Sequence, residues 1–101
     1  MKTVSVVMMT VGMLFASLPL AHAADAQAGK LKATSCLGCH GPDGKGSGPN
    51  PPIAGMAEQD FVAAMQAYKT GARTNAVMQA MAKSMSDEDV ANLAAYFATL
   101  K

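Results

Sequence analysis

Both cysteines of this 101-residue chain lie in one short stretch, and a histidine directly follows the second. The stretch is Cys36-Leu-Gly-Cys39-His40. Two thiols at this spacing, with an imidazole behind them, suit three kinds of chemistry. They can form a redox-active dithiol, provide part of a zinc site, or serve as the covalent attachment point of a haem.

The first two interpretations find little support elsewhere in the chain. A disulfide between Cys36 and Cys39 would close a very small loop and so would constrain the unfolded chain only weakly. A catalytic dithiol usually begins a helix that follows a strand, and no segment here has a strand pattern. A structural zinc site needs four ligands. Beyond Cys36, Cys39 and His40 the only other histidine is His22, and no spacing indicates a carboxylate that would complete the set.

Haem attachment accounts for more of the sequence. The pattern C-x-x-C-H is that of c-type haem, in which each sulfur forms a thioether and His40 is the proximal ligand of the iron. One covalently bound haem c per chain would also supply a core. The chain has three phenylalanines, two tyrosines and no tryptophan, and a domain this short buries little apolar surface of its own.

The first 23 residues have the pattern of an export signal. Lys2 is the only charge before residue 24, an apolar run follows it, and Ala21-His22-Ala23 has the small residues that a signal peptidase requires. We therefore expect a signal peptide over residues 1–23, cleavage before Ala24, one small haem-binding domain over residues 24–101 and a periplasmic location. The alternative is a retained membrane anchor, for which the apolar run is somewhat short.

The charge balance excludes one class of function. The eight basic residues include Lys2, so seven remain beyond residue 23, and seven acidic residues oppose them. A nucleic-acid-binding protein would need a basic surface, so none is expected as a partner. After signal cleavage we expect no stable insertion into a membrane either.

The remaining pattern predicts an all-α fold with three to five helices around the haem. We expect a helix from Asp25 to about residue 36, with Gly29 in its middle, and then a loop over residues 40–55 that is rich in glycine and proline. A second helix is expected over residues 60–70, ended by Gly71. Residues 72–85 are expected to be irregular or briefly helical. A last helix should begin at Ser86, because three acidic residues occupy its first turn.

These features together resemble the class I c-type cytochromes, over residues 25–101. The resemblance rests on "CLGCH", on "PPIAG" at residues 51–55, on a methionine-bearing segment and on a terminal "SDEDVANLAAYFATL". Within this class, the chain is similar to small bacterial monohaem cytochromes, to one half of dihaem cytochromes and to the haem subunit of flavocytochrome c sulfide dehydrogenases. The resemblance implies that the first and last helices cross where Gly29 meets Phe97 or Tyr96. It also implies that the Pro51 carbonyl accepts a hydrogen bond from His40.

A methionine as the sixth iron ligand is likewise implied by the resemblance. The family's ligand precedes the last helix, and Met78 matches its position best, with Met81 as the alternative. Met65 lies on the apolar face of its expected helix and is interpreted as core filler. Met56 follows the proline-rich loop too closely to be a strong candidate.

A haem held by His40 and Met78 implies electron transfer and not catalysis. Soft thioether sulfur favours ferrous iron and raises the reduction potential. The sequence offers no Ser/His/Asp set, paired carboxylates or phosphate loop. We expect a one-electron carrier that exchanges electrons with an oxidase, a reductase or a flavoprotein dehydrogenase. One alternative is the haem subunit of a dehydrogenase. A second is a gas-binding or peroxidatic haem, which would require the methionine to be absent or loosely bound.

Overall fold

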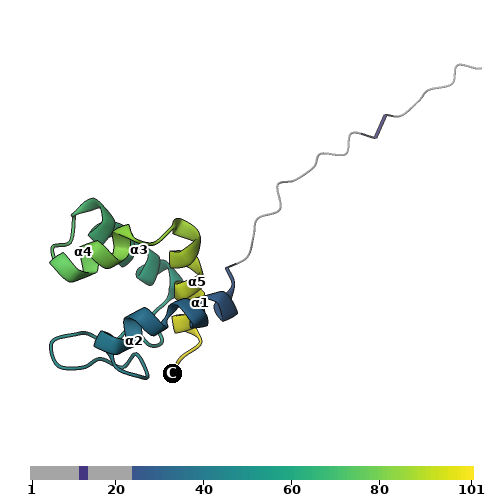
Figure 1. The fold of residues 1–101 in the computed structure, drawn as a ribbon. Helices are drawn as coiled ribbons and strands as arrows, with labels where there is room; N and C mark the ends of the chain where they lie inside the picture. Colours follow the sequence, from purple (N-terminus) through teal and green to yellow (C-terminus); the bar gives the residue numbers. More distant parts are fainter. Residues whose placement is uncertain (1–11, 14–23) are drawn as a thin grey trace, which may run out of the picture.

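The computed structural model describes residues 12–13 and 24–101, which contain five helices (Figure 1). The predicted all-α class is confirmed, and no strand occurs among these residues. The predicted signal peptide lies almost wholly outside them, and none of the helices that are described is long and apolar enough to cross a bilayer. In chain order the helices are α1 (Ala26–Lys32), α2 (Thr34–His40), α3 (Glu58–Thr70), α4 (Ala76–Lys83) and α5 (Asp87–Ala98).

The single helix expected from residue 25 to about residue 36 is in fact two helices, so that prediction was wrong in its extent. α1 ends before Ala33, and α2 continues to His40. The side chains at the break explain it. The Thr34 hydroxyl donates to the Leu31 carbonyl at 3.4 Å and the Ser35 hydroxyl donates to the Lys32 carbonyl at 3.1 Å, and such side-chain bonds bend helices. The whole C-x-x-C-H motif therefore lies on α2.

Helices α1 and α5 cross at Gly29, as the resemblance implied. A Cβ atom on Gly29 would overlap the backbone carbonyl of Asn92 and lie 2.9 Å from the Cβ atom of Tyr96. The aromatic residue at the crossing is thus Tyr96 and not Phe97. The N-terminal end of α1 is also fixed to α5, because the Asp25 backbone N–H donates to Asn92 Oδ1 at 2.8 Å.

Helix α3 confirms the predicted second helix, beginning two residues earlier than expected. Gly71 ends it in the left-handed conformation, with φ at 85°, which a residue with a side chain rarely adopts. Its apolar stripe faces inward as predicted, since Phe61 and Met65 are buried and Tyr68 is half-buried.

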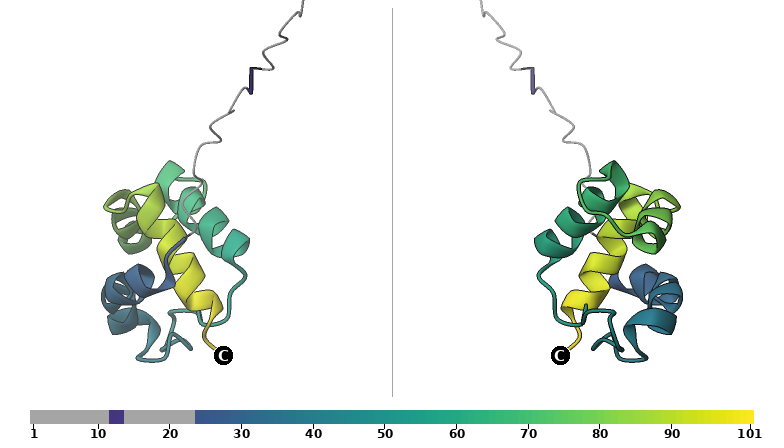
Figure 2. Two further views of the ribbon diagram at one scale, coloured as in Figure 1. Left: turned by 90° about the vertical axis from the view of Figure 1, so that its right-hand side faces the viewer. Right: turned by 90° about the vertical axis from the view of Figure 1, so that its left-hand side faces the viewer.

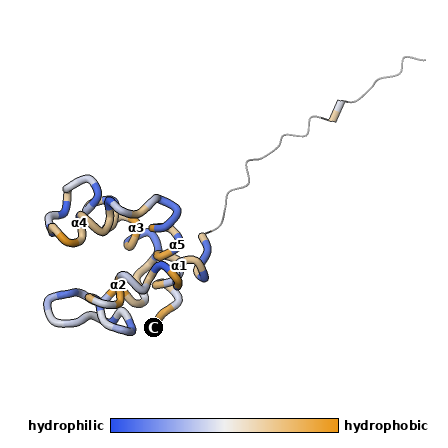
Figure 3. Tube along the Cα trace, viewed as in Figure 1, coloured by the Kyte–Doolittle hydropathy of each residue, from blue (hydrophilic) through white to orange (hydrophobic). Residues whose placement is uncertain are grey.

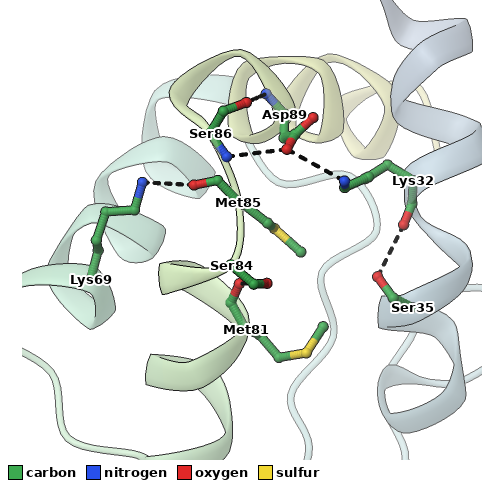
Figure 4. Close-up of polar contacts among 8 residues, drawn as sticks. All are labelled: Lys32, Ser35, Lys69, Met81, Ser84, Met85, Ser86 and Asp89. Carbon is green, nitrogen blue, oxygen red and sulfur yellow. Dashed lines mark hydrogen bonds and ion pairs between the residues drawn. The ribbon is translucent and has the colours of Figure 1, made fainter.

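The start of α5 is fixed by the predicted cap and acidic turn. Ser86 and Asp89 form a capping box, in which each side chain accepts a hydrogen bond from the other's backbone N–H at 3.1 Å. The bond from the Ser86 N–H holds the pKa of the Asp89 carboxyl below its usual range. Lys32 Nζ lies 3.4 Å from the same carboxylate and so connects α1 to this end of α5 (Figure 4).

The core lies along α5. Phe97, Leu93 and Val90 are its largest fully buried side chains, and the Phe97 ring stacks on that of Phe61 with centroids 5.5 Å apart. This contact joins α3 to α5, while the Gly29 crossing joins α1 to α5. Figure 2 shows α5 running between α1 on one side and α3 on the other.

The two remaining helices are peripheral. α4 forms within the segment expected to be irregular or briefly helical, and among the helices it packs only against α3. α2 packs only against α1. Helices α2 and α4 therefore project from the central scaffold and do not contact each other (Figure 1).

The Gly29 crossing gives a prediction. Gly29→Ala should lower the free energy of unfolding by about 2–3 kcal/mol, because the new methyl group meets the backbone of α5 and not a side chain that could move. Thermal unfolding measures this. Gly38→Ala is the matched control, since nothing lies within 4 Å of a Cβ atom there. The free energy of unfolding of Gly38→Ala should be unchanged or higher by up to about 1 kcal/mol. Equal effects at both positions would contradict the close crossing.

Candidate functional site

A cavity of about 440 Å³ occupies the space between α2 and α4. Its volume lies within the range of small-molecule and cofactor sites. Its walls are largely apolar, and both peripheral helices contribute to them. Figure 3 shows hydrophobic residues along the traces of both helices. The twenty lining residues are Ser35, Cys36, Cys39, His40, Pro49, Asn50, Pro51, Pro52, Ile53, Met56, Phe61, Ala64, Met65, Tyr68, Arg73, Asn75, Val77, Met78, Met81 and Met85.

The two cysteines lie on the α2 wall as free thiols. Cys36 is half-buried and Cys39 is exposed. Burial raises the pKa of the Cys36 thiol above its ordinary value, against a smaller opposing effect of a hydrogen bond with Ser35. A redox-active dithiol instead needs a thiol whose pKa is lowered. The environment of Cys36 therefore disfavours the dithiol interpretation.

His40 ends α2, lines the same wall and is buried. Its Nδ1 lies 2.6 Å from the carbonyl oxygen of Pro51. A carbonyl can only accept, so Nδ1 carries the proton and donates, which leaves Nε2 with the lone pair that a metal would bind. Such a partner fixes the orientation of the ring and strengthens it as a donor. The structure thus brings together the two residues that the resemblance paired.

Asn50 is a supporting residue that the sequence did not single out. Its side-chain amide donates to the Cys39 carbonyl at 2.9 Å, and its backbone pairs with that of Ser47. The Gly46 backbone N–H donates to the His40 carbonyl at 2.8 Å. The glycine- and proline-rich loop is therefore bonded to the end of α2, which places the Pro51 carbonyl beside the imidazole.

All five methionines beyond residue 23 line the cavity, so lining alone does not select one of them as a ligand. Met65 and Met85 are buried, and both belong to the apolar core cluster. Met78 and Met81 lie one turn apart on α4 and are half-buried, on the wall opposite the C-x-x-C-H motif. Met56 also lines the cavity, near the end of the proline-rich loop.

Both ends of the methionine-bearing segment are fixed by polar contacts. At the start of α4, Asn75 Oδ1 accepts from the Met78 backbone N–H at 3.0 Å. Beyond its end, Lys69 of α3 donates to the Met85 carbonyl at 2.9 Å, and Ser84 donates to the Met81 carbonyl at 2.7 Å (Figure 4). Met81 and Met85 direct their sulfur atoms away from these contacts in the same view. Asn75 is thus the N-cap of α4.

A zinc site has no complete ligand set in the described part of the chain. No group of three or more histidine, cysteine, aspartate or glutamate side chains gathers there closely enough to hold a metal ion. The donors around the cavity are instead one imidazole and several thioethers, which together suit haem iron.

Comparison with known proteins gives the same assignment. The family model of cytochrome c matches residues 26–101, which is more than half of the chain. The chain belongs to the cytochrome c family. Members of this family transfer electrons through covalently bound haem, so this chain has one haem c as its cofactor.

Three relatives illustrate the range of similar proteins. Cytochrome c4 of Pseudomonas aeruginosa is 46% identical over 84 residues, which cover 81% of this chain and 42% of that protein. Cytochrome c-554(548) of Halomonas halodenitrificans is 40% identical over 81 residues, which cover 76% of this chain and 98% of that protein. The cytochrome subunit of sulfide dehydrogenase of Chlorobaculum tepidum is 38% identical over 72 residues, which cover 71% of this chain and 66% of that subunit.

Solved structures share the fold. A thiosulfate dehydrogenase (TsdBA) from Marichromatium purpuratum superposes with a TM-score of 0.74 and 36% identity, over 80% of this chain and 20% of that one. The chain thus spans less than half the length of several proteins that it matches, including cytochrome c4.

The cavity fits the family's cofactor. The C-x-x-C-H motif is displayed on one wall, methionine sulfurs on the facing wall, and apolar side chains between them. Arg73 is a lining residue that the sequence did not indicate, because it belongs to no motif; its guanidinium lies over the ring of Tyr68, which also lines the cavity.

Proposed function

We propose that this chain is a periplasmic monohaem cytochrome that carries one electron at a time, with His40 and Met78 as the axial pair. The observation that supports this most directly is the placement of His40 and Met78 on facing walls of one cavity. Bound haem supplies the one-electron couple of its iron. The chain supplies attachment, ligands and orientation.

Each residue in the proposal has a separate task. Cys36 and Cys39 would hold the cofactor through thioethers, on a helix that the Asn50 amide bonds to the loop. His40 would present Nε2, because Pro51 occupies its other nitrogen. Met78 would present its sulfur from the first turn of α4, where the Asn75 cap holds its backbone.

The choice of Met78 over Met81 follows from this cap. The Met78 backbone is fixed by a bond from a side chain that itself lines the cavity. Met81, one turn later, stays the alternative ligand, because both methionines pack against the buried core cluster. Two protein ligands on the iron would leave no site for a substrate there, and a thioether ligand would raise the reduction potential. A gas-binding or peroxidatic role would require the methionine to leave.

The second candidate function is that of a haem subunit in a dehydrogenase. It is favoured by the similarity to the cytochrome subunit of sulfide dehydrogenase and to the thiosulfate dehydrogenase structure. In that case the electron donor would be a bound catalytic partner, for example a flavoprotein, and not a diffusing one. An oxidase or a reductase would be the partner of a free carrier.

Export is part of the proposal. Ala24, the first residue after the proposed cleavage site, is exposed, and Asp25 is already bonded to α5. Cleavage before Ala24 would thus leave the crossing of α1 and α5 intact.

The ligand assignment predicts different behaviour for two single variants. Met78→Ala should lower the reduction potential and let the ferrous iron bind carbon monoxide, because the sixth position opens. Met81→Ala should lower stability by roughly 2–3 kcal/mol through the cavity that it leaves, with the absorption spectrum of the iron–sulfur bond retained. Absorption spectroscopy and redox titration measure both. If the iron–sulfur band survives in Met78→Ala and vanishes in Met81→Ala, the ligand is Met81.

The carrier function predicts electron exchange without turnover. The reduced protein, purified alone, should pass its electron rapidly to an oxidised haem or copper protein and should show negligible steady turnover with sulfide or peroxide. Stopped-flow absorption measures the transfer. Sustained turnover by the isolated chain would contradict the carrier function. Co-purification with a flavoprotein at constant stoichiometry would instead support the function of a haem subunit.

A further inference from the structure

Helix α4 buries little of its own surface, although it carries Met78 and Met81. Among the helices it packs only against α3. Ala82 is its one buried residue, and Val77 is an exposed apolar side chain. The position of the methionine-bearing wall therefore depends on how the two ends of α4 are attached to the rest of the protein.

The N-terminal end of α4 is attached to the last turns of α3 through the connecting turn. The Gly71 backbone N–H donates to the Tyr68 carbonyl at 3.3 Å. The Arg73 backbone N–H donates to the Ala67 carbonyl at 3.0 Å. Asn75 then caps the helix. This end of α4 is thus fixed by short-range contacts, most of which join backbone atoms.

The C-terminal end of α4 is attached to the same part of α3 by one side chain. Met85 follows α4, and its backbone N–H donates to the Ala82 carbonyl at 3.2 Å. The Met85 carbonyl accepts from Nζ of Lys69, on α3, at 2.9 Å (Figure 4). This hydrogen bond is part-buried, and its charged donor makes it stronger than a bond between neutral groups. Lys69 therefore bridges α3 to the end of the methionine-bearing helix.

The Lys69 ammonium has a second partner, which contributes less. Asp87 Oδ1 lies 3.6 Å from Lys69 Nζ, but the Asp87 side chain is 86% exposed. An ion pair with a partner so exposed to water contributes little to stability. The bond to the Met85 carbonyl is thus the contact through which Lys69 acts on α4.

We propose that Lys69 is a positioning residue for the iron–sulfur bond, because it holds the end of α4 against α3 and so keeps a methionine of α4 over the haem iron. The inference rests on the proposed function, in which Met78 or Met81 is the sixth ligand, and it holds for either. Without Lys69, the chain between α4 and α5 would lose its polar bond to α3. The methionine would then leave the iron more often, and an added ligand would take its place.

The test replaces Lys69 by methionine in the haem-bearing protein. Lys69→Met keeps a long apolar side chain and removes the ammonium. Imidazole added to the ferric protein is the probe, because it ligates the iron only when the methionine has left. Absorption spectroscopy follows the iron–sulfur band and the imidazole complex, and thermal unfolding measures the global stability of the same samples. Lys69→Gln, a shorter neutral side chain, takes the place of Lys69→Met if that variant does not accumulate.

Two control variants separate the bond to the carbonyl from other effects. Asp87→Asn removes the ion pair with Lys69 and keeps the Lys69 bond to Met85. Lys32→Met removes another lysine that ties two helices together, since Lys32 Nζ lies 3.4 Å from Asp89 Oδ2. Lys32 belongs to α1, which does not pack against α4. Its loss therefore reports the effect of lower stability away from the methionines.

We expect Lys69→Met to bind imidazole roughly tenfold more tightly than the wild type, since loss of a hydrogen bond with a charged donor shifts the opening of α4 by about that factor. Lys69→Arg should show a smaller change, because a guanidinium can still donate to the carbonyl. Asp87→Asn and Lys32→Met should stay within about twofold of the wild type, even where their unfolding temperature falls.

An unchanged imidazole affinity in Lys69→Met would overturn the proposal. An equal rise in Lys32→Met or Asp87→Asn would also overturn it, because the effect would then not come from the bond to the Met85 carbonyl. A wild-type protein without an iron–sulfur band would instead contradict the methionine ligation in the proposed function, and Lys69 would then have no iron–sulfur bond to hold.

Discussion

The two walls that would hold the haem do not touch each other, and this constraint shapes the rest of the structure. α2 packs on α1 alone and α4 packs on α3 alone. The C-x-x-C-H motif and the methionines of α4 are connected only indirectly, through the packing of α1, α5 and α3. A cofactor tied covalently to one wall and ligated from the other would set the distance between them. The cofactor is therefore a structural part of the domain as well as its redox centre.

The protein part of the core is correspondingly small. Its fully buried large side chains come from α5, and the Phe61 and Phe97 rings supply the main aromatic contact. A domain of this size rarely gains more than roughly 3–5 kcal/mol from such a core. The scaffold of α1, α3 and α5 can orient the two walls, with the Gly29 crossing and the Lys69 bond to the Met85 carbonyl as fixed points. We propose that it is too small to hold the walls in place by itself.

Sequence reasoning succeeded where local chemistry decides the structure. The start of α5 at Ser86 and the end of α3 at Gly71 depend on neighbours within one or two turns, so the sequence predicts them. The sequence did not predict the break between α1 and α2 before Thr34, where two side-chain hydroxyls donate to backbone carbonyls and so compete with the helix. The position of Arg73 at the cavity rim could not be predicted, because it depends on where α3 places Tyr68 in three dimensions.

The central claim is that covalent haem supplies the part of the core that the chain lacks. Hydrogen exchange followed by mass spectrometry on the variant Cys36→Ala with Cys39→Ala tests it most directly, with the haem-bearing wild type as reference. The account predicts that the backbone amides of α2 and α4 lose their protection in the haem-free variant, together with its cooperative thermal unfolding. If α2 and α4 stay protected without haem, and the variant unfolds cooperatively, the polypeptide holds the two walls by itself and the claim is wrong.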